Sequence, residues 1–175
     1  MKDYKNTRWA NEILKLQEEN GMWNYFHTMG APDKNYPLAS EQALRRLHVL
    51  GFGIEYPVIH KAVDFMVDCL DGKEVMPDRR EVLLDWDVFT ELMLSTWIRK
   101  FTSEEESANK IADKWAQIIS AGWSSGEYQK ADAEAVYLTL YPERTRGLRL
   151  VDFITSYYHV SLLPGLMDEE TESLY

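Results

Sequence analysis

The sequence predicts an all-α protein. Apolar residues recur at the i, i+3, i+4, i+7 spacing of one helix face in successive runs along the 175 residues. Glycine and proline separate these runs, as they commonly do between helices. No Val-, Ile- or Thr-rich stretch alternates apolar and polar residues as a half-buried β-strand would. We therefore expect about seven helices joined by short breaks.

Three helices are expected in the N-terminal part of the chain. The first covers residues 8–19, and Gly21 ends it because glycine readily adopts the left-handed conformation that closes a helix. Residues 24–38 hold two prolines and a glycine and are expected to form a loop. The second helix covers residues 39–50. The third begins at Pro57, because proline suits the first turn of a helix.

Four further helices are expected toward the C-terminus. The fourth covers about residues 85–100. Ser103 and Glu106 have the spacing of a capping box and are expected to open the fifth helix. The sixth covers about residues 130–141 and ends before a proline, and the seventh covers about residues 145–160.

Length and composition indicate one helical-repeat domain, residues 1–166, followed by an acidic tail, residues 167–175. Apolar residues make up 45% of the chain, too many for a disordered polypeptide. No apolar run reaches the ~20 residues that cross a bilayer, and the start lacks the apolar stretch of a signal peptide, so we expect no membrane span and a cytoplasmic location. Cys69 is the only cysteine, which excludes an internal disulfide.

The net charge of the chain is −10. Such a surface repels phosphate backbones, and no stripe of Lys and Arg with interleaved aromatic residues offsets it. We therefore expect no nucleic-acid partner.

The run of helices contains an internal repeat of about 50 residues. At this offset the apolar pair around Ile13 aligns with the pair at Met66, which in turn aligns with the pair at Trp115. The first and third units each end in Gly-x-aromatic, at residues 21–23 and residues 126–128. A second helix follows each break, so the repeating unit is a helical hairpin.

This pattern resembles the repeats of the α/α-toroid superfamily, which includes squalene and other terpenoid cyclases and the β-subunits of protein prenyltransferases. Their motif runs from a basic residue through an aromatic-aliphatic pair and a glutamine to Gly-x-Trp. In the first unit the matching residues are Arg8, Ile13, Gln17, Gly21 and Trp23. Trp9 and Glu12 depart from the motif, since they stand where a small residue and an aromatic residue are expected. In the second unit Leu70 replaces the glutamine, and in the third Ser120 does.

The resemblance implies a structural role for Gln17, Gly21 and Trp23. In the relatives the glutamine ends an outer helix and its amide meets the tryptophan, which ties neighbouring hairpins together. A complete toroid has about twelve helices, so the resemblance implies a partial ring here. An open arc leaves an apolar flank uncovered, which favours self-association, for example as a homodimer.

Asp85 and Asp87 are the candidate catalytic residues. They match the first two carboxylates of the Asp-x-Asp-Asp motif of class II terpenoid cyclases, in which the middle aspartate protonates an alkene, while Val88 replaces the third. The resemblance thus implies Asp87 as a general acid, a role that requires a dry cavity. The alternative, which the sequence favours, is that Asp85 or Asp87 caps the fourth helix.

Metal binding is not expected. Asp68, Cys69 and His159 are the only set comparable with the zinc ligands of prenyltransferase β-subunits. Adjacent helical residues point about 100° apart, and the close ligand spacing of a zinc site is absent. We expect no metal and no cofactor.

Five side chains are candidates for a ligand surface because they fall on the alternate helices that line the inside of a toroid or lie beside such a face. They are Trp86, Trp97, Tyr137, Tyr141 and His48. The alternative is that the aromatic residues belong to an ordinary core and that the histidine is hydrogen-bonded at its edge.

Three functions follow from these observations. The favoured one is a non-catalytic helical-repeat module that binds a partner or a second copy of itself. The second is a carrier of a small apolar, isoprenoid-like ligand. The third is an enzyme resembling terpenoid cyclases or prenyltransferases, with Asp87 as its acid.

Overall fold

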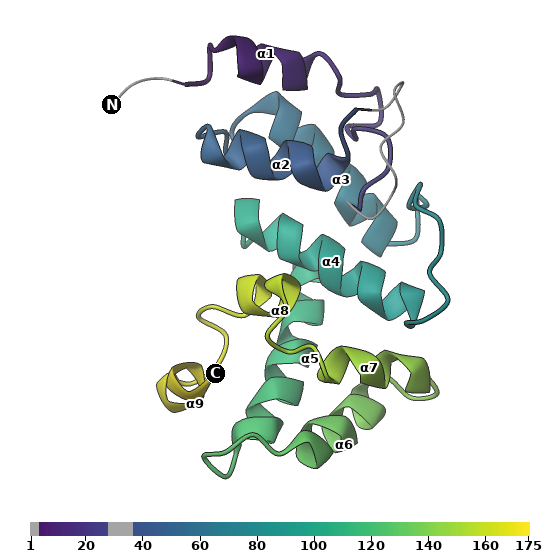
Figure 1. Cartoon of the computed structure of the whole chain (residues 1–175), viewed down its shortest axis with the longest axis vertical. Helices are drawn as coiled ribbons and strands as arrows, with labels where there is room; N and C mark the ends of the chain where they lie inside the picture. The colour runs from purple at the N-terminus through teal and green to yellow at the C-terminus, as the bar shows by residue number, and fades with distance from the viewer. Residues whose placement is uncertain (1–3, 28–36) are drawn as a thin grey trace. The chain divides into compact units, whose positions relative to one another are not determined.

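The computed structural model describes residues 4–27 and 37–175, which form nine α-helices and a short 3-10 helix and no β-strand (Figure 1). The predicted all-α fold class is confirmed. The chain divides into two compact units, Met1–Arg79 and Arg80–Tyr175. In the part of the chain that is described, every helix is too short or too polar to cross a membrane.

The first unit contains three helices, α1 (Arg8–Leu14), α2 (Ser40–Val49) and α3 (Pro57–Leu70). α2 and α3 lie where the sequence predicts them, and α3 begins at the expected proline. Their buried faces, together with the segment that follows α1, form the core of the unit. Its largest fully buried side chains are Met22, Trp23, Phe26, Leu44, Leu47, Ile59 and Met66.

α1 ends at Leu14, earlier than the predicted end at residue 19. The reason is a change in hydrogen bonding. The N–H groups of Leu16 and Gln17 donate to carbonyls three residues back, which tightens the backbone out of the α-helix. The chain then turns at Gly21, whose φ is +94°. Residues 28–36 of the predicted loop lie outside the described residues.

The second unit contains the other helices, with α5 at the centre of its core. They are α4 (Trp86–Phe101), α5 (Glu106–Trp123), α6 (Lys130–Leu140), η1 (Thr145–Gly147), α7 (Leu148–Val151), α8 (Tyr157–Leu162) and α9 (Glu169–Leu174). Trp115 of α5 is fully buried, and its ring contacts those of Tyr137, Tyr141 and His159.

Two predictions for helix boundaries in this unit are wrong. The fifth helix does not begin with a capping box, because Glu105 is its N-cap and makes no side-chain cap. The carbonyl of Ser103 instead accepts a hydrogen bond from Asn109 Nδ2, at 2.9 Å. The predicted seventh helix, residues 145–160, is broken into η1, α7 and α8, because the backbone tightens into i−3 hydrogen bonds over residues 152–156.

The acidic C-terminal segment forms a helix of its own. Asp168 caps α9 by accepting hydrogen bonds from the N–H and the hydroxyl group of Thr171, at 2.8 and 3.0 Å. The hydroxyl group of Tyr175 donates to the carbonyl of Ile154. Capping at one end and this anchor at the other explain why residues 169–174 are helical despite their charge.

Candidate functional site

Gln17, Gly21 and Trp23 form a buried junction in the first unit. The Gln17 amide Nε2 donates to the carbonyl of Gly21 and to the carbonyl of Val58 in α3, both at 2.8 Å. The Trp23 indole N–H donates to the carbonyl of Ile13 at 2.8 Å, and the Trp23 side chain is 1% exposed. The glutamine therefore links the end of α1 to the first turn of α3. It does so through two backbone carbonyls, whereas the resemblance implied a meeting of amide and indole.

Gly21 is required at this junction for two reasons. Its φ of +94° lies in the left-handed region, and a Cβ atom added there would lie 2.5 Å from the carbonyl oxygen of Lys61. The equivalent residue of the third repeat, Gly126, also has a positive φ, of +84°, but nothing lies within 4 Å of an added Cβ atom. Close backbone approach is thus a property of the first repeat.

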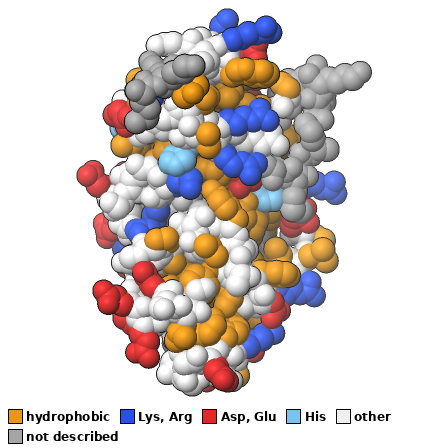
Figure 2. Space-filling model, turned by 60° about the vertical axis from the view of Figure 1, so that its left-hand side comes forward, with side chains coloured by type: hydrophobic (Ala, Val, Ile, Leu, Met, Phe, Trp, Pro, Cys, Tyr) orange, Lys and Arg blue, Asp and Glu red, His pale blue; other side chains and the backbone are white. Residues whose placement is uncertain are grey.

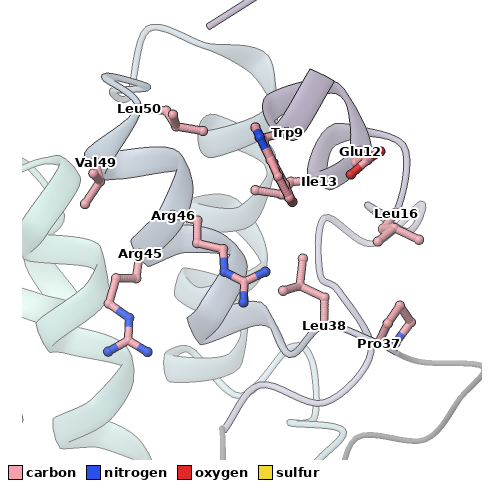
Figure 3. A pocket seen from close by; sticks show the side chains of 10 residues that line it. All are labelled: Trp9, Glu12, Ile13, Leu16, Pro37, Leu38, Arg45, Arg46, Val49 and Leu50. Atoms are coloured by element: carbon pink, nitrogen blue, oxygen red, sulfur yellow. The ribbon is translucent and has the colours of Figure 1, made fainter. Parts of the chain in front are cut away.

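A groove of about 720 Å³ opens between α1 and α2, beside this junction (Figure 3). Most of its lining is apolar. The lining residues are Trp9, Glu12, Ile13, Leu16, Pro37, Leu38, Arg45, Arg46, Val49 and Leu50. Trp9 and Val49 are 75% and 80% exposed, so two of the apolar side chains that line the groove face solvent. We name this feature the α1/α2 groove.

Basic side chains stand at one wall of the α1/α2 groove. Arg45 and Arg46 are exposed on α2 and make no ion pair with any residue that the structure describes. Glu12, on the opposite wall, is already paired with Arg8 at 2.7 Å. In the space-filling view, hydrophobic and basic side chains lie next to one another on the surface of the first unit (Figure 2). The groove therefore combines an apolar lining with two arginines that are unpaired within the described part of the chain.

Asp85 and Asp87 lie at the start of α4. Asp85 is the N-cap and accepts a hydrogen bond from the N–H of Val88 at 3.3 Å. Asp87 is paired with Arg80 at 2.6 Å and with Arg144 at 2.9 Å, and its side chain is 43% exposed. The arrangement provides a helix cap and an ion-pair cluster, and it does not supply the dry cavity that protonation of an alkene requires.

The four aromatic candidates are buried in the second unit. Trp86 and Trp97 are buried on α4, where Trp86 contacts Phe89 and Trp97 stacks on Phe101. The other two, Tyr137 and Tyr141, are stacked on each other against Trp115. Burial raises the pKa of both tyrosines. All four side chains are therefore buried against other aromatic residues.

His48 is exposed on α2 and is not among the residues that line the α1/α2 groove. The residues compared with zinc ligands are Asp68, Cys69 and His159, and they do not share one environment. Cys69 is half-buried, which raises the pKa of its thiol to about 12, and His159 is fully buried, which lowers the pKa of its imidazole to about 3. Among residues 4–27 and 37–175, no three His, Cys, Asp or Glu side chains lie together as metal ligands would.

Sequence reasoning identified the junction but missed the groove. In the sequence Trp9 stands out only as a departure from the repeat motif, and Arg45 and Arg46 are not among the residues predicted to bind a ligand. The signal that could have found the site is a tryptophan on the outer face of a short helix. When such a side chain lies beside other exposed apolar residues, the patch that they form marks a candidate interaction surface.

Comparison with known proteins gives no relative: the chain matches no protein-family model, and no curated protein or solved structure is significantly similar to it.

Proposed function

We propose that this protein is a non-catalytic helical binding module and that the α1/α2 groove is its binding site. The observation that carries the proposal is the combination of an apolar groove, an exposed tryptophan and two arginines that have no ion pair among the residues the structure describes. Tryptophan and arginine are the residues most enriched where binding energy is concentrated in protein interfaces. A ligand suited to the groove has an apolar body and a negative charge.

The junction supports this role because it fixes one wall of the groove. Ile13 lines the groove, and its carbonyl accepts the hydrogen bond from Trp23. Gln17 links the end of α1 to α3 through Val58. A wall held in this way is preorganised, so binding needs little ordering of the backbone. The same junction supports a relationship to α/α-toroid repeats, which remains part of the proposal.

A carrier of a small apolar anion, such as an isoprenoid-like ligand, is the second candidate. Its support is the volume of about 720 Å³, which lies within the range of roughly 300–1,000 Å³ of small-molecule sites. Against it stands the exposure of Trp9 and Val49, which would leave one side of a thin ligand in water. A protein surface would cover both residues, so a protein is the favoured occupant.

An enzyme with Asp87 as general acid has the least support. Asp87 is 43% exposed and paired with Arg80 and Arg144, whereas protonation of an alkene requires a dry cavity. We expect Asp87→Asn to leave ligand binding at the groove unchanged.

The test uses anilinonaphthalene sulfonate, a fluorescent probe with an aromatic body and one negative charge. We expect the folded protein to bind it, and Trp9→Ser and the double variant Arg45→Glu, Arg46→Glu each to weaken binding at least about tenfold. Val75→Ser is the matched control, since Val75 is 85% exposed in the same unit and lies outside the groove. Circular dichroism checks that each variant is folded. Equal binding by wild type and Trp9→Ser contradicts the proposal.

A further inference from the structure

The most exposed large apolar side chains of the described residues gather largely in two places. Trp9 and Val49 belong to the α1/α2 groove. Val82 and Leu83, which are 78% and 67% exposed, lie next to each other before α4 in the second unit. The chain therefore carries the apolar α1/α2 groove and, in the second unit, an exposed apolar segment.

The exposed segment comprises residues 81–84, and we name it the projecting segment. It is held in place at several points. Leu84 packs against the core of the second unit, and the Leu83 carbonyl accepts a hydrogen bond from Arg149 Nη1 at 3.0 Å. Asp85, the next residue, caps α4. The backbone is thus anchored while the side chains of Val82 and Leu83 face solvent.

The charges of the two surfaces are complementary. Glu81 begins the projecting segment, is exposed, and makes no ion pair among the residues described. Arg45 and Arg46 in the groove likewise lack ion pairs there. In a chain of net charge −10, an apolar groove with two arginines that lack ion pairs among the described residues attracts an acidic, apolar segment of this kind.

We propose that the α1/α2 groove of one copy binds the projecting segment of a second copy. Val82 and Leu83 then cover Trp9 and the apolar floor, and the Glu81 carboxylate meets the guanidinium groups of Arg45 and Arg46. This inference rests on the proposed function, because it names the occupant of the same groove.

The symmetry of such a contact follows from its two different surfaces. A groove that binds a segment elsewhere on the molecule makes a heterologous interface, which gives closed rings or open chains of copies. The contact is small, so we expect dissociation constants of roughly 10 μM to 1 mM. Association therefore depends on protein concentration within the range of ordinary solution measurements.

The experiment is sedimentation equilibrium of the full chain across that concentration range. We expect the average mass of the wild type to rise above one chain, while Trp9→Ser and Leu83→Ser each remain at the mass of one chain. The side chains of Trp9 and Leu83 are 75% and 67% exposed, so each change removes only a small buried area from the fold. Val75→Ser, the matched apolar control, associates like the wild type.

Mixing the two variants gives the sharpest result. Trp9→Ser keeps an intact projecting segment and Leu83→Ser keeps an intact groove, so one good interface remains for each pair. We expect the mixture to form a complex of two chains and no larger species. Charge reversal provides a second test. We expect Arg45→Glu combined with Arg46→Glu to abolish association, and the further change Glu81→Lys in the same chain to restore it.

A mixture that stays at the mass of one chain overturns the inference. If the Trp9-dependent binding of the fluorescent probe persists in that case, the groove is a binding site for another acidic, apolar protein and only self-recognition fails. If probe binding is also independent of Trp9, the proposed function fails with it.

Discussion

The two units of the chain differ in how their buried polar side chains are hydrogen-bonded. In the first unit the polar atoms of the motif are bonded, since Gln17 reaches two carbonyls and the Trp23 indole reaches a third. In the second unit the indole N–H groups of Trp115 and Trp123 are buried and have no hydrogen-bond partner. The aromatic residue of Gly-x-aromatic in this unit is Tyr128, whose hydroxyl group donates to the carbonyl of Val151 at 3.2 Å. The second unit therefore does not reproduce the hydrogen bonds that Gln17 and Trp23 make in the first.

The contrast extends to other buried polar groups. Among the residues described, all the buried side-chain nitrogen and oxygen atoms that lack a hydrogen-bond partner belong to the second unit. They are on Thr90, Glu91, Ser95, Trp115, Trp123, Tyr141 and His159. A buried polar group without a partner costs about 1–3 kcal/mol. The second unit therefore depends more heavily on its aromatic packing, and the first on its specific hydrogen bonds.

The largest expected effect comes from the glycines of the two repeats. Gly21→Ala should lower the free energy of unfolding by about 3 kcal/mol or more, because the new methyl group meets the Lys61 carbonyl at 2.5 Å in a left-handed conformation. Gly126→Ala incurs only the conformational cost, of about 1 kcal/mol. Urea unfolding of the two variants measures the difference, and equal costs would contradict a close approach at Gly21.

The next effect concerns the glutamine of the junction. Gln17→Leu leaves the carbonyls of Gly21 and Val58 without this donor and should cost about 2–3 kcal/mol. Gln117→Leu is the matched control, because Gln117 Nε2 donates only to Asp113 on an exposed helix face, at 3.2 Å. We expect that change to cost less than about 0.5 kcal/mol in the same unfolding measurement. A cost for Gln17→Leu no greater than the control's would remove the junction from the account.

Acid should affect the second unit through His159. Burial lowers the pKa of His159 to about 3 from its ordinary value of 6.5. Between these values the unfolded chain binds a proton that the folded chain does not, so stability is complete above pH 6.5 and falls as the pH is lowered, by roughly 1.4 kcal/mol per pH unit. Burial raises the pKa of Glu91, which acts in the opposite direction.

Because the two groups oppose each other, the test compares the wild type with His159→Phe. We expect the wild type to lose about 2 kcal/mol more than the variant between pH 6.5 and pH 5 in unfolding experiments. Parallel pH profiles for the wild type and His159→Phe would show that His159 is not buried as described.

The smallest effect compares two fully buried serines. Ser40 Oγ accepts a hydrogen bond from the N–H of Trp23 at 2.8 Å, whereas Ser95 Oγ has no partner. Ser40→Ala should therefore destabilise the protein by about 1–2 kcal/mol, while Ser95→Ala should be neutral or stabilise it by up to about 1 kcal/mol. Changes of the same sign in thermal unfolding would contradict the contrast between the units.

Helix positions were predictable where a local signal fixed them. Pro57 sets the start of α3, and the breaks around α2 and α6 are equally local. The end of α1 was not predictable. The spacing of one helix face continues to Gln17, but the N–H groups of Leu16 and Gln17 already donate to carbonyls three residues back. The break in residues 145–160 and the helix in the acidic tail depend on contacts such as that of Tyr175 with Ile154, which periodicity does not encode.

The candidate site was predictable only in its supporting junction. Gln17, Gly21 and Trp23 have a spacing that the sequence displays directly. The aromatic candidates, such as Trp97 and Tyr137, were placed by analogy with the inside of a ring, yet they are fully buried. Trp9 and Arg45 come from separate helices, so their shared groove depends on how α1 lies beside α2.

Indole N–H resonances test the central claim most directly, because the chain has six tryptophans and each contributes one signal. Two-dimensional NMR during titration with anilinonaphthalene sulfonate, followed by transfer into D₂O, reports on the groove and the junction together. The account predicts that the Trp9 signal shifts with added probe and exchanges quickly, while the Trp23 signal stays in place and remains protected. A Trp9 signal that does not move, or a Trp23 signal lost as quickly as that of Trp9, would contradict it.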